Sequence, residues 1–146
     1  MKKALLCVGN ELRGDDGVAI SLGREIEQLC PDWQVFYGFD TPESEIYAIR
    51  DYEPDFLLIA DAAVGGFGAE FMQNEAGVAF NTHTLPLHIL KRYLDEFCPK
   101  ILFLALFIKA ENFSTISTTL SSDAKNTLKI ALEKFNELNE ILNQQN

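Results

Sequence analysis

The residues of this sequence best suited to chemistry are two aspartates and a histidine near the ends of expected strands and helices. Asp16 lies in the turn 14–17, Asp61 directly follows the apolar run 56–60, and His83 lies in a polar stretch before a helix. Two carboxylates and one imidazole form a mixed oxygen and nitrogen ligand set that suits a borderline divalent metal and leaves coordination positions open. Two aspartates can instead perform acid–base chemistry, with one protonated and one ionised. The residue types leave both chemistries open.

Each of these side chains also has an ordinary structural role when it is taken alone. Asp15 or Asp16 can cap the helix that follows the turn or place a favourable charge in its first turn. Asp61 can begin an Asx-turn at the end of its strand. A loop histidine such as His83 is more often exposed or capping, and His88 is expected on a helix surface. A functional site therefore requires the fold to bring Asp16, Asp61 and His83 to one rim.

Other catalytic groups fit the sequence poorly. The pattern Gly-X-Ser-X-Gly of serine hydrolases is absent. The turn 14–17 stands where a phosphate loop would stand, but its two aspartates would repel a phosphate, and neither glycine-rich phosphate pattern is present. Cys7, Cys30 and Cys98 are an odd number without Cys-X-X-Cys spacing. We expect all three to be structural, in a reducing compartment.

Short apolar runs alternate with segments of helical periodicity. Strands are expected over 4–8, 33–37, 56–60 and 101–107, an irregular strand or hairpin over 70–73 and 78–80, a polar loop over 112–122, and helices over 18–29, 42–52, 86–97 and 123–142. This alternation predicts an α/β three-layer sandwich, with a twisted, mostly parallel sheet of about five strands flanked by helices.

The expected sheet also predicts where a ligand would bind. In open α/β sheets, ligands lie beyond the carboxyl ends of the strands near the topological switch point. The strand ends in this sequence are 9–10, 61–62 and the segment after 107. The last helix is expected to cover the sheet through one apolar stripe, formed by Leu128, Leu132, Phe135, Leu138 and Leu142.

The composition is that of an ordinary globular protein with a strong negative charge. Of 146 residues, 47% are hydrophobic and 23% charged, and 12 basic against 22 acidic residues leave a net charge of −10. This charge repels nucleic acid and anionic membrane surfaces and favours cations or a basic partner. The longest apolar run, 101–108, is far shorter than a membrane span. We expect one soluble, cytoplasmic domain over 1–146, with no nucleic-acid or membrane partner.

The run 8–19 resembles the amino-terminal signature of the hydrogenase maturation endopeptidases. It reads Val-Gly-Asn-Glu-Leu-Arg-Gly-Asp-Asp-Gly-Val-Ala. The segments 57–62 and 82–87 continue the resemblance, and 41–50 is most similar to the branch that serves hydrogenase 3 of the formate hydrogenlyase type. The matching motifs extend over about the first hundred residues and are specific when taken together.

The resemblance implies an endopeptidase that removes a carboxyl-terminal extension from the large-subunit precursor of a nickel–iron hydrogenase after nickel insertion. It implies that Asp16, Asp61 and His83 contact a metal, which is the nickel borne by the precursor, although other divalent metals can occupy such a site. Asp16 and Asp61 would also be catalytic, in either an aspartic-type or a metal-dependent hydrolysis. The alternative is a non-catalytic nickel-binding chaperone or assembly factor with the same three residues.

Two segments depart from the family pattern. The bulky segment 37–40 stands where the family usually has a glycine-rich acidic turn, and 107–122 lacks the Gln-Pro pair that tends to follow the last strand. These departures leave the three candidate ligands intact but leave the precursor and the shape of the substrate groove open. A nucleotide-binding module is a third interpretation, which the two aspartates of the turn 14–17 oppose.

Overall fold

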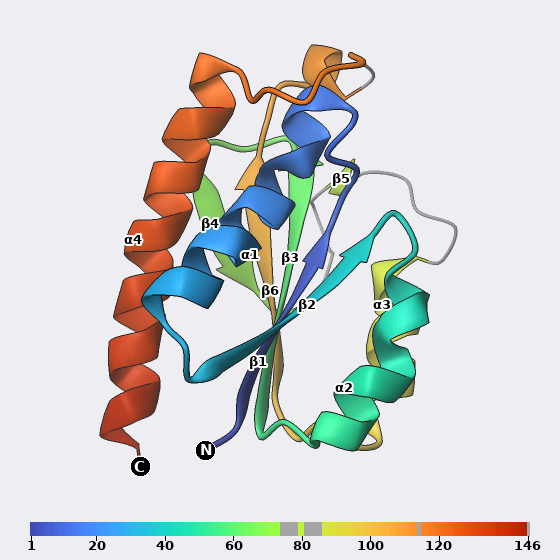
Figure 1. The fold of residues 1–146 in the computed structure, drawn as a ribbon, viewed down its shortest axis with the longest axis vertical. Helices are drawn as coiled ribbons and strands as arrows, with labels where there is room; N and C mark the ends of the chain where they lie inside the picture. Colours follow the sequence, from blue (N-terminus) through green and yellow to red (C-terminus); the bar gives the residue numbers. More distant parts are fainter. Residues whose placement is uncertain (74–78, 81–85, 114, 146) are drawn as a thin grey trace.

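The structure is a computed structural model that describes residues 1–73, 79–80, 86–113 and 115–145. Figure 1 shows a twisted sheet between two layers of helices. One face is covered by α1 (Val18–Leu29) and α4 (Ser122–Gln144), and the other by α2 (Ile46–Tyr52) and α3 (Leu87–Asp95). The predicted three-layer α/β sandwich is therefore confirmed. No helix among the described residues is both long enough and apolar enough to cross a membrane.

The sheet is mostly parallel, and its main strands follow the order β2-β1-β3-β6-β4. The described strands are β1 (Lys3–Val8), β2 (Trp33–Phe39), β3 (Phe56–Val64), β4 (Ala69–Met72), β5 (Ala79–Phe80) and β6 (Ile101–Phe107). β1, β2, β3 and β6 pair in parallel, whereas β4 lies antiparallel to β6 and the two-residue β5 lies antiparallel to the end of β3. Short 3₁₀ helices, η1 (Gly14–Gly17), η2 (Pro42–Glu45) and η3 (Ala110–Asn112), follow β1, β2 and β6.

The central strands β1 and β3 are buried on both faces, which explains their apolar runs 4–8 and 56–60. Successive side chains of a strand point to opposite faces. In β3, Leu58 belongs to the core beneath α1 and α4, whereas Leu57 and Ile59 belong to the core beneath α2 and α3. The helices thus pack on the sheet through two separate apolar cores, one on each face.

Cys7 of β1 lies in the core beneath α1. A Cβ atom built on Gly23 of α1 would lie 2.4 Å from its Sγ, so the helix reaches this distance from the strand only with glycine at that position. Burial raises the pKa of the Cys7 thiol. All three cysteines are free, in agreement with the prediction that they form no disulfide framework.

The order of the strands reverses at β1. α1 connects β1 to β2 on one side, and the chain then crosses through α2 to β3 on the other side of β1. The topological switch point therefore lies between the carboxyl ends of β1 and β3. We call this the carboxyl-end edge of the sheet. It lies at the top of Figure 1, and both chain termini lie at the opposite, amino-end edge.

A buried lysine connects three elements at the amino-end edge. Lys3 Nζ lies 2.6 Å from Asp32 Oδ2, 3.2 Å from Asn139 Oδ1 and 2.9 Å from Asn143 Oδ1. It also lies 5.6 Å from the centroid of the Trp33 ring. Three acceptors match the three protons of the ammonium group, so this charge joins β1, the start of β2 and the last turns of α4.

One local prediction was wrong and two were confirmed in part. β3 does not end before Asp61 but continues to Val64, because β6 and β5 pair with its last residues. Strands do occur near residues 70 and 80, but they do not form the alternative hairpin, since β4 pairs with β6 and β5 with β3. The predicted residues of α4 do face the core, although the fully buried stripe consists of Ala124, Thr127, Ala131, Phe135 and Leu142.

Small residues form the part of the α4 stripe that was not predicted. Ala124 and Ala131 let the helix axis approach the sheet, and the hydroxyl of Thr127 donates to the carbonyl of Phe107 over 2.8 Å. Leu128, Leu132 and Leu138 flank this contact and are only half-buried. Leu29, the last residue of α1, is exposed.

Candidate functional site

Asp16 is held over the carboxyl end of β1. The chain turns after Val8 and forms η1, which places the Asp16 side chain against the start of its own loop. The Asn10 backbone N–H donates to Asp16 Oδ2 over 2.8 Å, and Asp16 is only 1% exposed. This hydrogen bond fixes one carboxylate oxygen in place.

Glycine is required at two points of this turn. A Cβ atom on Gly9 would lie 2.1 Å from the Asp16 carbonyl oxygen, and Gly9 has a φ of +139°. A Cβ atom on Gly17 would lie 2.7 Å from Glu11 Cα. The sequence therefore allows η1 to pack directly on the loop after β1, and this packing positions Asp16.

Asp61 lies on the neighbouring strand at the same edge. It pairs with Val8 of β1 and with Ala105 of β6, and none of its surface is exposed. Since Val8 is the last residue before the loop that holds Asp16, the register brings Asp61 to that loop, and η1 contacts β3. Asp61 was predicted at a strand end, but it lies inside β3, level with the end of β1.

The strand alternation assigns Asp61 to one face of the sheet. Leu57 and Ile59 precede it at two-residue steps and pack toward α2 and α3. Asp61 therefore belongs to the face that α3 covers. α3 begins at Leu87, and His83 lies four positions earlier in the sequence.

His83 lies outside the described residues, so its predicted convergence with Asp16 and Asp61 stays a prediction. Within the described residues, no group of three histidine, cysteine, aspartate or glutamate side chains could hold a metal ion. The structure thus brings the two predicted carboxylates to one edge of the sheet. His88, predicted on the helix surface, is exposed in α3.

Asp15 has a structural role that differs from the predicted cap. Its Oδ1 accepts from the Ser121 N–H over 2.8 Å, and its Oδ2 accepts from Ser121 Oγ over 2.6 Å and from Asn112 Nδ2 over 3.0 Å. Neither Asp15 nor Asp16 caps α1, because η1 intervenes and Gly17 precedes the helix. Asp15 instead joins the turn after β1 to the loop after β6.

Ser121 completes this connection and caps α4. Its Oγ accepts from the Ala124 N–H over 3.1 Å while donating to Asp15. The same loop pairs with the turn after β1 through the Gly14 N–H to the Ser117 carbonyl, 2.8 Å, and the Ser117 N–H to the Leu12 carbonyl, 3.0 Å. Sequence reasoning missed this contact because its partners are about a hundred positions apart.

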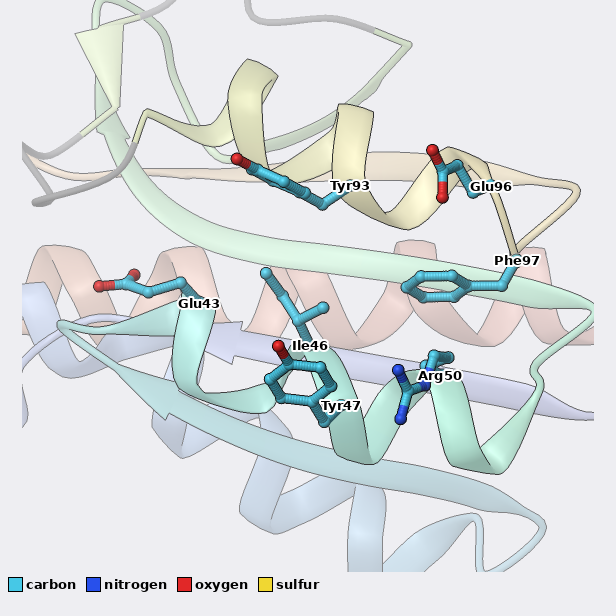
Figure 2. Close-up of a pocket in the computed structure, with 7 residues that line it drawn as sticks. All are labelled: Glu43, Ile46, Tyr47, Arg50, Tyr93, Glu96 and Phe97. Atoms are coloured by element: carbon cyan, nitrogen blue, oxygen red, sulfur yellow. The ribbon is translucent and has the colours of Figure 1, made fainter.

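A separate pocket of about 430 Å³ lies between α2 and α3, and neither Asp16 nor Asp61 lines it. Figure 2 shows Tyr47 and Tyr93 projecting from the two facing helices, with Ile46 and Phe97 between them. The Arg50 guanidinium lies 4.9 Å from the centroid of the Tyr47 ring. The pocket also contains the carboxylates Glu43 and Glu96, so it is an apolar groove with a mixed charged border.

Comparisons of the sequence and of the fold with known proteins both find similar proteins. The chain is 32% identical over 140 residues to the hydrogenase 3 maturation protease of Escherichia coli strain K12, covering 91% of this chain and 90% of that protein. Its fold is similar to that of an uncharacterized protein from Wolinella succinogenes, with 44% identity, a TM-score of 0.84, and 97% and 99% of the two chains covered.

A second solved structure is the endopeptidase HycI from Escherichia coli. It is 28% identical, with a TM-score of 0.74, and the match covers 88% of this chain and 85% of that one. No family model matches the chain. These relatives match nearly the whole chain.

Proposed function

The chain belongs to the hydrogenase maturation protease family and is a peptidase, and from this premise we propose that it removes a carboxyl-terminal extension from the nickel-loaded large-subunit precursor of a hydrogenase. The observation that carries the proposal is the placement of two buried carboxylates, Asp16 and Asp61, at the switch point of the sheet. Open α/β sheets bind their ligands at this position. The three free cysteines are consistent with action in the reducing cytoplasm.

Asp16 and Asp61 have the chemistry that peptide hydrolysis needs. One ionised carboxylate accepts a proton from a water molecule as that water attacks the scissile carbonyl carbon. The proton then passes to the leaving nitrogen as the carbon–nitrogen bond breaks, which yields a new carboxylate and a new amine. A protonated partner carboxyl can donate a hydrogen bond to the carbonyl oxygen during this step.

His83 is proposed as the nitrogen ligand of the same site. It precedes α3, and α3 packs on the face of the sheet to which Asp61 belongs. Nickel accepts imidazole and carboxylate ligands, and a ligand set with open positions can dock onto an ion that the precursor already holds. In this proposal nickel is part of the substrate, and docking onto it brings the scissile bond to the carboxylates.

The test uses the purified full-length chain and a nickel-loaded large-subunit precursor, with the masses of the products as readout. The wild type is expected to release one carboxyl-terminal fragment. Asp16→Asn and Asp61→Asn keep the side-chain shape but lose the charge, and we expect cleavage to slow on the order of a hundred-fold or more with precursor binding retained. His83→Ala should mainly weaken binding of the nickel-loaded precursor.

Asp32→Asn is the matched control, since it makes the same change at the amino-end edge. Its cleavage rate should equal that of the wild type. Wild-type cleavage rates in both Asp16→Asn and Asp61→Asn would show that neither carboxylate is catalytic. Tight binding of nickel-loaded precursor without any cleavage by the wild type would instead identify a nickel-binding assembly factor.

A further inference from the structure

Each loop or strand end at the carboxyl-end edge exposes one large apolar side chain. Leu12 follows β1, Phe39 ends β2, Phe67 follows β3 and Ile116 follows β6. We call these four residues the apolar rim. Exposed apolar side chains are common singly, but their occurrence after all four parallel strands at one edge is characteristic of an interaction surface.

The segments that carry the apolar rim are joined to one another. The Gly9 N–H donates to the Phe39 carbonyl over 2.7 Å, which links the end of β2 to the loop after β1. The hydrogen bond of 3.0 Å from Ser117 to the Leu12 carbonyl brings Ile116 beside the same loop. On the side of β6, Gly66 packs on the Phe107 ring and so fixes the turn that carries Phe67.

Phe39 has a strained backbone at this edge. Its φ of +52° lies in the left-handed region, which large L side chains rarely adopt. Its ring stacks on that of Tyr37, with the centroids 6.2 Å apart and the planes at 26°. Strained residues that the surroundings hold in place tend to cluster at ligand sites.

Two ion pairs lie near the rim. Arg24 lies 2.7 Å from Glu11 beside the first loop, and Lys109 lies 2.8 Å from Asp123 beside the loop after β6. Arg13 and Asp40 are exposed beside Leu12 and Phe39, so the edge offers a partner apolar contacts with charged neighbours. The buried carboxylates Asp16 and Asp61 lie at the same edge of the sheet.

We infer that the apolar rim is the docking surface for the polypeptide substrate, through an apolar segment of the precursor next to its scissile bond. The inference rests on the proposed function and adds to it the surface and the kind of contact that select the substrate. A peptidase must hold a polypeptide at its reactive groups, and the rim lies at the same edge of the sheet as the two carboxylates. Two alternatives compete with this inference. A second copy of this chain could occupy the rim, or the substrate could dock in the α2–α3 groove.

The test compares two double variants with matched residue types. Leu12→Ser with Ile116→Ser alters the rim, and Leu29→Ser with Ile141→Ser alters the amino-end edge. Leu12 and Leu29 are 60% and 67% exposed, and Ile116 and Ile141 are 91% and 53% exposed, so neither pair should disturb folding. Equal thermal midpoints of the two variants would verify this.

The readout is the rate of precursor cleavage as a function of precursor concentration. We expect the rim variant to raise KM about tenfold or more and to leave kcat within about twofold, and the amino-end variant to match the wild type. Equal KM values for the two variants overturn the inference, as does a comparable rise in KM for Tyr47→Ala with Tyr93→Ala. Loss of self-association in the rim variant with unchanged KM would assign the rim to a second copy. Absence of cleavage by the wild type would refute the proposed function itself. Failure of the proposed function can therefore be told apart from failure of the docking inference.

Discussion

The two edges of the sheet bury different charged groups. At the amino-end edge, the ammonium group of Lys3 is surrounded by hydrogen-bond acceptors. At the carboxyl-end edge, the fold brings two aspartates, Asp16 and Asp61, to the loop after β1. Lys3 has three oxygen acceptors within 3.2 Å, from Asp32, Asn139 and Asn143. Asp16 and Asp61 are at least as deeply buried as Lys3, and the pairing of Val8 with Asp61 places them at the same strand end.

The difference separates a structural use of buried charge from a chemical one. A buried charge whose hydrogen bonds are satisfied by neighbouring elements fixes how those elements pack. Two acidic side chains at the switch point of the sheet are instead placed where open α/β sheets bind their ligands. Such an arrangement is typical of catalytic sites, which are often less stable than the same scaffold without its reactive groups.

Deletion of residues 123–146 should have the largest effect, because α4 contributes to both edges. Its start is bound through Ser121 to Asp15, and its last turns bind Lys3. The deletion would also uncover Trp33, whose ring centroid lies 4.8 Å from that of Phe135. We propose that 1–146 is one cooperative domain, so circular dichroism should show no thermal transition for the shortened chain. A cooperative transition would contradict this proposal.

Gly9→Ala should have the second-largest effect on stability, because it disrupts only the carboxyl-end edge of the sheet. The new Cβ would lie 2.1 Å from the Asp16 carbonyl oxygen at a φ of +139°. We expect a loss of at least about 3 kcal/mol in the free energy of unfolding, measured in urea. Gly65→Ala is the control, since Gly65 has a φ of +102° but nothing within 4 Å of the new Cβ. Its loss should be only about 1–2 kcal/mol, and equal losses would refute the steric explanation.

Lys3→Met should lower stability by about 2 kcal/mol, because the carbonyl oxygens of Asn139 and Asn143 lose a charged donor. The Asp32 carboxylate is more than half exposed and can be hydrated, which limits the loss. Cleavage of precursor well below the unfolding temperature should be unchanged. A fall in kcat would mean that the two edges are coupled. It would contradict the view that the amino-end edge has a structural role only.

Asp15→Asn tests the structural role assigned to Asp15. The change weakens the bonds to Ser121 and Asn112, and we expect a loss of about 1–2 kcal/mol in the free energy of unfolding. Urea denaturation measures this loss. An unchanged free energy of unfolding would contradict the connection that Asp15 makes between the turn after β1 and the loop after β6.

Asp32 should give the smallest effect, visible as a pH dependence. Its hydrogen bond from Lys3 lowers the pKa of the Asp32 carboxyl below its ordinary value of 3.8. The folded state therefore gains stability that is fully present above pH 3.8 and is lost as the pH falls through the lowered pKa. At neutral pH, Asp32→Asn should lose less than about 1 kcal/mol, since Asp32 is largely exposed. The difference in unfolding free energy between the two proteins should shrink as the pH falls through the lowered pKa of Asp32, and a constant difference would exclude the ion pair as its cause.

The strands were predictable where burial on both faces leaves an uninterrupted apolar run, as at 4–8 and 101–107. The end of β3 was not, because Asp61 was interpreted as a stop, although the apolar residues 62–64 continue the strand. Burial of Asp61 depends on β1 and β6, which are distant in sequence. On α4, the alanines that contact the sheet are weaker sequence signals than the leucines that flank them.

The two candidate carboxylates were predictable because each lies next to a local signal, a glycine turn for Asp16 and an apolar run for Asp61. The role of Asp15 was not, since Ser121 and Asn112 reach it only through the fold. The apolar rim was missed for a related reason. Leu12, Phe67 and Ile116 stand in unrelated loops, and only the parallel sheet brings those loops to one edge.

Cys7 gives the molecule an internal reporter of its own opening. Its sulfur lies beneath Gly23 in the core, and burial keeps the thiol in its unreactive protonated form. An alkylating reagent can reach it only when α1 separates from β1, whereas the partly exposed Cys30 is accessible in the folded state. The delay between alkylation of Cys30 and alkylation of Cys7 therefore measures how often α1 separates from the centre of the sheet, without any introduced label.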